Sequence, residues 1–207
     1  HVLKALVERN KLDEKNLDEF IYSTVLLDPR TANWAREILF SAGLSKDIYA
    51  HSVSNNCISG LIAITDVAER IALEKTKSGI AGGVDSLSNP TLSFSYKSST
   101  KFLELFRARS LGDRIKIILS LRPKDFFPQP PAVTEPSTGL TMGQHMEITA
   151  QEIGIERAEQ DKIAYLSHIN AAKATEEGLL ADEIAELEGL TKDTIVRADT
   201  TEEKLAK

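Results

Sequence analysis

The chain has 207 residues, of which 42% are hydrophobic and 27% charged, a composition typical of a soluble globular protein. Its single cysteine excludes an internal disulfide framework and indicates a reducing compartment. The formal net charge of -6 argues against a general nucleic-acid binder, and no apolar run reaches membrane-spanning length. The first residues have the pattern of a helix interior, so we expect no signal peptide there.

Hydrophobic patterning in the first part of the chain alternates between the helix and strand periods. Strands are predicted at 20–25, 48–54 and 80–84, separated by helices at 33–42 and 58–77. This alternation is typical of a parallel α/β sheet. Apolar residues surround the first half of the helix at 58–77, so we expect that half to be buried nearly all round. Gly82 and Gly83 in the third strand predict a close approach of another group to the backbone.

The second part of the chain is predicted to be mainly helical. Helices are expected at 99–106, 111–121, 142–153 and 158–177, and the proline-rich segment 122–143 predicts an extended connector. Gly154 is the expected stop of the helix at 142–153.

The stretch from 101 to 124 carries seven basic and two acidic residues, a local net charge of +5, with large apolar residues between them. One interpretation is a basic amphipathic segment that contacts an anionic membrane surface or a partner subunit. The other, which is commoner in proteins, is a solvated helical face whose apolar side packs on the domain.

Cys57 lies at the predicted turn between the second strand and the helix that follows it. The N-terminus of a helix favours a thiolate, which makes such a turn a good place for a nucleophile. Cysteine is also among the most buried residue types and usually only packs. The turn alone therefore leaves a catalytic and a structural role open.

Four ordered segments resemble motifs of the thiolases. Residues 53–64, VSNNCISGLIAI, are similar to the acyl-enzyme cysteine signature, and residues 81–90, AGGVDSLSNP, to the Gly-Gly strand and its turn. Residues 141–147 resemble the start of the substrate-covering loop domain, and residues 155–178 resemble the helix that follows it. The order and separations agree over nearly the whole chain. The connector at 128–135 further resembles the thiolase subunit of fatty-acid β-oxidation multienzyme complexes.

The resemblance implies an α/β fold in which a βαβαβ core surrounds a buried helix and carries an inserted, mostly helical loop domain. We expect residues 1–92 to form most of the family's first half, incomplete at its N-terminus, and residues 93–207 to form the loop domain. The family's second half supplies a catalytic histidine in Gly-His-Pro and an acid/base cysteine in Cys-Gly-Gly. Neither motif occurs in the 207 residues, so we expect the second half to be absent and the chain alone to have no turnover.

The implied reaction is thiolysis of a 3-ketoacyl-CoA, or the reverse condensation, through an acyl group held on Cys57. Coenzyme A is then a co-substrate, and neither a cofactor nor a metal is expected. Met142 matches a position that lines the acyl pocket, with a core methionine as the alternative. Arg197 falls where the family has an arginine near the CoA nucleotide, with a surface arginine as the alternative. Asp85 stands in place of the family's usual glutamate.

Two other functions stay open at this point: a condensing enzyme that uses an acyl carrier protein, and a truncated thiolase-like subunit without catalysis. The resemblance implies a homodimer or higher oligomer, and the subgroup implies a hydratase/dehydrogenase partner subunit. Under the first interpretation of residues 101–124, this segment makes a peripheral membrane contact, and no nucleic-acid partner is expected. The expected location is the bacterial cytoplasm or the mitochondrial matrix.

Overall fold

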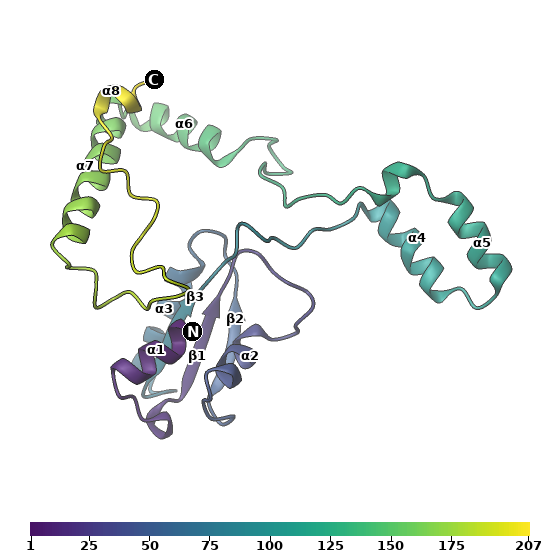
Figure 1. Ribbon diagram of the computed structural model, residues 1–207, viewed down its shortest axis with the longest axis horizontal. Coiled ribbons are helices and arrows are strands. Elements are labelled where there is room, and N and C mark those ends of the chain that lie inside the picture. Colours follow the sequence, from purple (N-terminus) through teal and green to yellow (C-terminus); the bar gives the residue numbers. More distant parts are fainter. The chain divides into compact units, whose positions relative to one another are not determined.

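The computed structural model describes residues 1–207, and the chain divides into two compact units. One unit comprises residues 14–132 and holds a small sheet with its helices (Figure 1). The other combines residues 1–13 with residues 133–207 and is mainly helical. The predicted domain boundary between residues 92 and 93 rests on the family resemblance and stays a prediction.

The sheet of the first unit has three parallel strands, as predicted. They are β1 (Glu19–Ser23), β2 (Tyr49–Val53) and β3 (Gly79–Gly83), in the order β2-β1-β3. Ile21 of β1 lies in register with His51 of β2 and with Ala81 of β3. Because β1 has a neighbour on each side and a helix on each face, all five of its residues are buried.

Two helices cover opposite faces of this sheet. They are α2 (Trp34–Ser41), which connects β1 to β2, and α3 (Ser59–Ala72), which connects β2 to β3. The chain moves from β1 to β2 on one side of the sheet, and then from β2 back across β1 to β3 on the other side. Because connections between parallel strands are right-handed, two connections that run in opposite directions place their helices on opposite faces. Ile21 packs with Ala63 and Val67 of α3. On the other face, the Ala35 N–H of α2 donates to Ser52 Oγ at 3.3 Å.

The helix α3 differs from its prediction in burial. Ala63 and Val67 face the sheet and are buried, but Leu61 and Ile64 are 60% and 57% exposed. The expectation of near-complete burial is wrong for this chain, because one three-stranded sheet can cover only one side of a helix. The helix also ends at Ala72 rather than near residue 77, and Glu74 beyond it has a left-handed φ of 55°.

Residues 93–129 of the first unit form a helical hairpin. It consists of α4 (Tyr96–Arg107), α5 (Leu111–Ser120) and the short 3-10 helix η2 (Pro123–Phe126). Ser95 and Ser110 cap the two α-helices by accepting hydrogen bonds from backbone N–H groups. The two ends of the hairpin segment lie side by side, since Ser93 and Gln129 exchange backbone hydrogen bonds of 3.2 and 2.6 Å.

The short 3-10 helix η1 (Glu14–Asn16) belongs to the first unit, and all the other helices not yet described belong to the second unit. They are α1 (Val2–Arg9), α6 (Met142–Ile153), α7 (Arg157–Glu176) and α8 (Glu202–Leu205). Thr141 and Gln144 form a capping box at the start of α6, and Gly154 ends it with a φ of 79°. The predictions of a helix at 142–153 and of its stop are confirmed. No helix in the chain combines the length and the hydrophobicity of a membrane-spanning segment.

Candidate active site at the carboxyl ends of the strands

The carboxyl ends of all three strands open into one hollow of about 240 Å³. Parallel α/β sheets bind ligands at this edge, because the loops that follow adjacent strands diverge there. The lining comes from the ends of β1 and β3 with the residues that follow them, from the turn after β2 and from the first turn of α3: Ser23, Thr24, Val25, Asn56, Cys57, Ser59, Gly60, Gly83, Val84 and Asp85. The sequence had marked Cys57 as a candidate nucleophile, and the structure places it in this hollow.

A strained turn presents Cys57, which is exposed. The preceding residue, Asn56, has a φ of 48°, a left-handed value that asparagine tolerates better than most residues. The buried Ser59 secures the turn: its Oγ accepts from the Asn55 N–H at 2.7 Å and donates to the Asn56 carbonyl at 2.6 Å. The helix begins two residues after Cys57, so the thiol lies at the approach to the helix N-terminus.

Ser23 and Gly83 are paired residues of β1 and β3 that line the hollow, and their backbones lie in close contact. A Cβ atom on residue 83 would lie 1.9 Å from the Ser23 carbonyl oxygen and 2.3 Å from its Oγ. Only glycine fits at such a distance. The predicted close approach is therefore confirmed at Gly83, whereas a Cβ on Gly82 would meet nothing within 4 Å.

Asp85 joins the loop after β1 to the end of β3. Its Oδ1 accepts from Thr24 Oγ1 at 2.7 Å and from the Leu26 N–H at 2.8 Å. The Val25 N–H lies 3.0 Å from both carboxylate oxygens. Burial raises the pKa of Asp85, but the hydrogen bonds from Leu26, Thr24 and Val25 outweigh it, and the pKa is lowered. A second link is the Tyr22 hydroxyl, which donates to the Val84 carbonyl at 2.8 Å.

The sequence did not mark Ser23, Thr24 or Ser59 as members of the site. Their signal was positional and weak, since Ser23 and Thr24 lie inside the predicted strand at 20–25, whereas β1 ends at Ser23, and Ser59 lies at the start of the helix that follows β2. Parallel strands bring such residues together, but only when the strand order is known.

The other two predicted site residues, Met142 and Arg197, belong to the second unit, whereas Cys57 belongs to the first. Met142 is the first residue of α6 and is 63% exposed. The backbone N–H of Arg197 donates to His168 Nδ1 at 3.2 Å, which ties the segment after α7 to that helix. Their roles in substrate binding stay predictions. No group of three or more His, Cys, Asp or Glu side chains in the chain is arranged to hold a metal ion.

The family model described as "Thiolase, N-terminal domain" matches residues 1–207. The chain belongs to the thiolase family. A 3-ketoacyl-CoA thiolase of Pseudoalteromonas translucida is 40% identical over 183 residues, which cover 88% of this chain and 42% of that protein. One from Pectobacterium carotovorum is 37% identical over 212 residues, covering 100% of this chain and 48% of that protein.

Among solved structures, the acetyl-CoA acetyltransferase of Bacillus anthracis is similar, with a TM-score of 0.72 and 26% identity. The match covers 99% of this chain and 50% of that one. The predicted thiolase resemblance and the α/β fold class are therefore confirmed. The chain spans about half the length of the curated relatives that it matches.

Proposed function

We propose that this chain carries the acyl-accepting nucleophile of an acyl-CoA C-acyltransferase that cleaves 3-ketoacyl-CoA. The observation that carries the proposal is the position of Cys57 on a strained turn, in the hollow at the carboxyl ends of three parallel strands. The names of the thiolase relatives support the same reaction class. They also favour it over a condensing enzyme that uses an acyl carrier protein.

In this proposal the Cys57 thiolate attacks the 3-keto carbonyl carbon of the substrate. The bond between C2 and C3 breaks, and its electron pair leaves with the acetyl-CoA fragment, which takes up a proton. The shortened acyl group stays on sulfur as a thioester. The thiol of a second coenzyme A then attacks this thioester, which releases the shortened acyl-CoA and restores Cys57. A thiol suits both steps because a thioester is activated enough to be transferred again.

The residues of this chain supply the nucleophile and its surroundings. The family resemblance assigns the base and the acid to Gly-His-Pro and Cys-Gly-Gly motifs, which do not occur in the 207 residues. We therefore expect acylation of Cys57 without steady turnover. Acylation in the absence of a base is favoured at mildly alkaline pH, where a fraction of cysteine thiols is ionised.

The test is a single-turnover incubation of the chain with acetoacetyl-CoA at mildly alkaline pH, followed by peptide mass analysis. We expect one acetyl group on the peptide that contains Cys57, and none in the Cys57→Ala variant. Acetylation of lysines only, with Cys57 unmodified, would contradict the proposal. Release of acetyl-CoA at the rates of a complete thiolase would contradict the expectation that the chain alone does not turn over.

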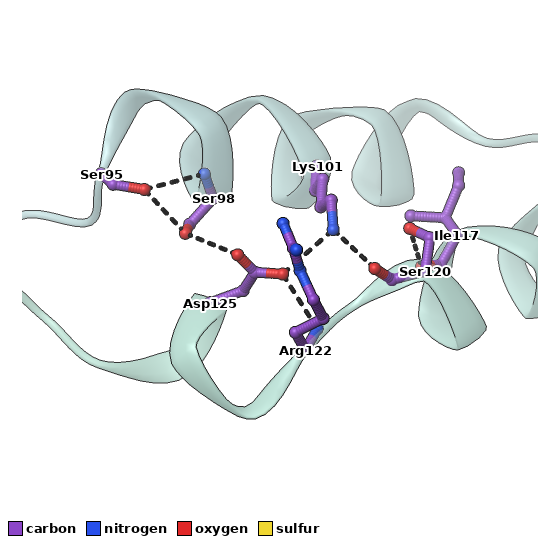
Figure 2. A network of polar contacts seen from close by, with 7 residues as sticks. All are labelled: Ser95, Ser98, Lys101, Ile117, Ser120, Arg122 and Asp125. Atoms are coloured by element: carbon purple, nitrogen blue, oxygen red, sulfur yellow. Dashed lines mark hydrogen bonds and ion pairs between the residues drawn. The ribbon is translucent and has the colours of Figure 1, made fainter.

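We further propose that the helical hairpin contacts an anionic membrane surface. The hairpin is held together internally around the carboxylate of Asp125, which is 3% exposed (Figure 2). Asp125 accepts from the Arg122 N–H at 2.9 Å, from Lys101 Nζ at 3.0 Å and from Ser98 Oγ at 3.4 Å. Lys101 Nζ also donates to the Ser120 carbonyl at 2.6 Å, so one lysine joins α4 to the end of α5.

The apolar residues of the hairpin support a surface function because the helices leave many of them exposed. Phe106, Leu111 and Leu119 are 87%, 77% and 80% exposed. They lie in the segment 101–124, whose net charge is +5 in a chain of net charge -6. Apolar side chains among basic ones suit the interface of an anionic bilayer, where the apolar side chains can enter the acyl region and the basic ones can contact the anionic headgroups.

Sedimentation with vesicles tests this contact. We expect the chain to bind vesicles of phosphatidylcholine with phosphatidylglycerol, to bind pure phosphatidylcholine less, and to be released by high salt. Phe106→Ser combined with Leu111→Ser is expected to abolish binding. The matched control is Leu87→Ser, since Leu87 is 81% exposed outside the hairpin. Equal binding by the double variant and the control would contradict the proposal.

We propose for this chain the two partners that the family resemblance implies: a second copy of the chain and a hydratase/dehydrogenase subunit. The edge position of β2 in the sheet supports self-association, since an edge strand has backbone groups available for pairing. The bacterial sources of the thiolase relatives favour the bacterial cytoplasm over the mitochondrial matrix as the location.

A further inference from the structure

We propose that Asp85 is a positioning residue that sets the width of the hollow around Cys57. The inference deepens the proposed function of Cys57 and rests on it for its biological meaning. Asp85 and the loop that it holds, through Thr24 and Val25, all belong to the lining of the hollow. The position of this wall therefore decides how large a group can reach the thiol.

The geometry shows why one carboxylate can hold the wall. Three consecutive residues after β1 direct donors at Asp85: the Thr24 hydroxyl and the N–H groups of Val25 and Leu26, all within 2.7–3.0 Å. Hydrogen bonds to a charged acceptor are stronger than those between neutral groups. The lowered pKa of Asp85 agrees with a carboxylate that stays ionised at neutral pH. The loop after β1 is thus fixed to the end of β3 by side-chain contacts rather than by sheet pairing.

The length of the side chain matters as much as its charge. Asparagine has nearly the same size, but it carries no negative charge, and its amide nitrogen, which cannot accept a hydrogen bond, would replace one of the two oxygens beside the Val25 N–H. Glutamate keeps the charge but is one methylene longer, so its carboxylate can keep the donors only if the loop moves outward. We therefore expect the width of the hollow to increase from the natural protein to Asp85→Glu and further to Asp85→Asn.

A pair of reagents with the same chemistry measures this width. N-methylmaleimide and N-(1-pyrenyl)maleimide both alkylate thiolates, but they differ greatly in size. The ratio of their rates at Cys57 cancels the fraction of ionised thiol and reports steric access. We expect Asp85→Asn to raise the ratio of the pyrenyl to the methyl rate by about tenfold, since it removes charge-assisted hydrogen bonds. Asp85→Glu should raise it less.

The matched control is Asp28→Asn. Asp28 lies in the same loop after β1 and also has a lowered pKa, but its carboxylate bonds only to Arg30. It has no link to β3, so its loss should leave the rate ratio unchanged. A ratio that is the same in Asp85→Asn, Asp28→Asn and the natural protein, with all three folded by circular dichroism, would overturn the proposal.

Two further variants keep the inference testable if Asp85→Asn does not fold. Thr24→Val removes one donor, and Asp85→Glu retains the charge; either should raise the ratio, and no change in both would also overturn the proposal. The outcome is distinct from that of the proposed function. If Cys57 is not acetylated by acetoacetyl-CoA but the ratio still depends on Asp85, the acyl-transfer proposal fails and the positioning role stands.

Discussion

The two ends of the central strand β1 both carry polar residues, yet they serve different purposes. At the amino end, Glu19 is 1% exposed and accepts a hydrogen bond from Arg70 Nε at 2.7 Å. At the carboxyl end, Ser23 lies against Gly83 beside the hollow that contains Cys57. The amino end is filled by an ion pair, and the carboxyl end borders an open hollow.

The difference comes from what surrounds each end. Arg70 of α3 reaches Glu19 and also lies over the Tyr49 ring, 5.4 Å from its centroid. His51 Nδ1 lies 3.8 Å from the second Glu19 oxygen, and neither of these two buried atoms has a hydrogen-bond partner. At the other end, the backbones of β1 and β3 meet at a glycine, and Asp85 takes its donors from a loop. Polar residues at a strand end thus indicate a candidate binding site only where no neighbouring side chain fills the space around them.

The largest effect is expected from Gly83→Ala, which would break the open end. The added Cβ would lie 1.9 Å from the Ser23 carbonyl oxygen, so the two strands must separate. We expect a loss of roughly 3 kcal/mol or more in the free energy of unfolding, measured by urea denaturation. Gly82→Ala is the matched control, because its Cβ would meet nothing within 4 Å. Equal stability of the two variants would contradict this account of the site.

A smaller effect is expected from Glu19→Gln, which would break the filled end. The substitution removes the charge that pairs with Arg70, and we expect a loss of about 2 kcal/mol in the free energy of unfolding. The labelling rate of Cys57 should not change, because the ion pair lies at the opposite end of the sheet. Glu14→Gln, at an exposed position, serves as the control. A large change in Cys57 labelling without loss of stability would refute the division between the two ends.

The smallest effect concerns acid pH. Hydrogen bonds from the Arg122 N–H and from Lys101 lower the pKa of Asp125 from 3.8 to about 2, and the pKa of Asp85 is also lowered. A carboxylate with a lowered pKa stabilises the fold above its ordinary pKa, and this contribution is lost as the pH falls toward the lowered value. Thermal midpoints should therefore decrease between about pH 4 and pH 2. The decrease should be smaller in Asp125→Asn, and an identical pH dependence would rule out this origin.

Sequence patterns predicted the features that depend on nearby residues. The three strands and the helix at 142–153 were found from hydrophobic period, and the stop at Gly154 from the need for a left-handed residue. The start of the helix at 58–77 was predicted correctly, but the helix ends at Ala72, and the prediction of its burial was wrong. Leu61 and Ile64 are apolar and exposed, since an apolar pattern shows what a helix can bury and not which surfaces are present to cover it.

The sequence by itself determined the family, the parallel α/β class and Cys57 as the candidate nucleophile, because each depends on local order along the chain. Only the tertiary structure decided which residues stand around that thiol. The strand order β2-β1-β3 brings together the ends of three strands that are far apart in sequence. Asp85 and Thr24 meet across 61 positions of the chain, and such a contact arises from sheet topology, which no local pattern encodes.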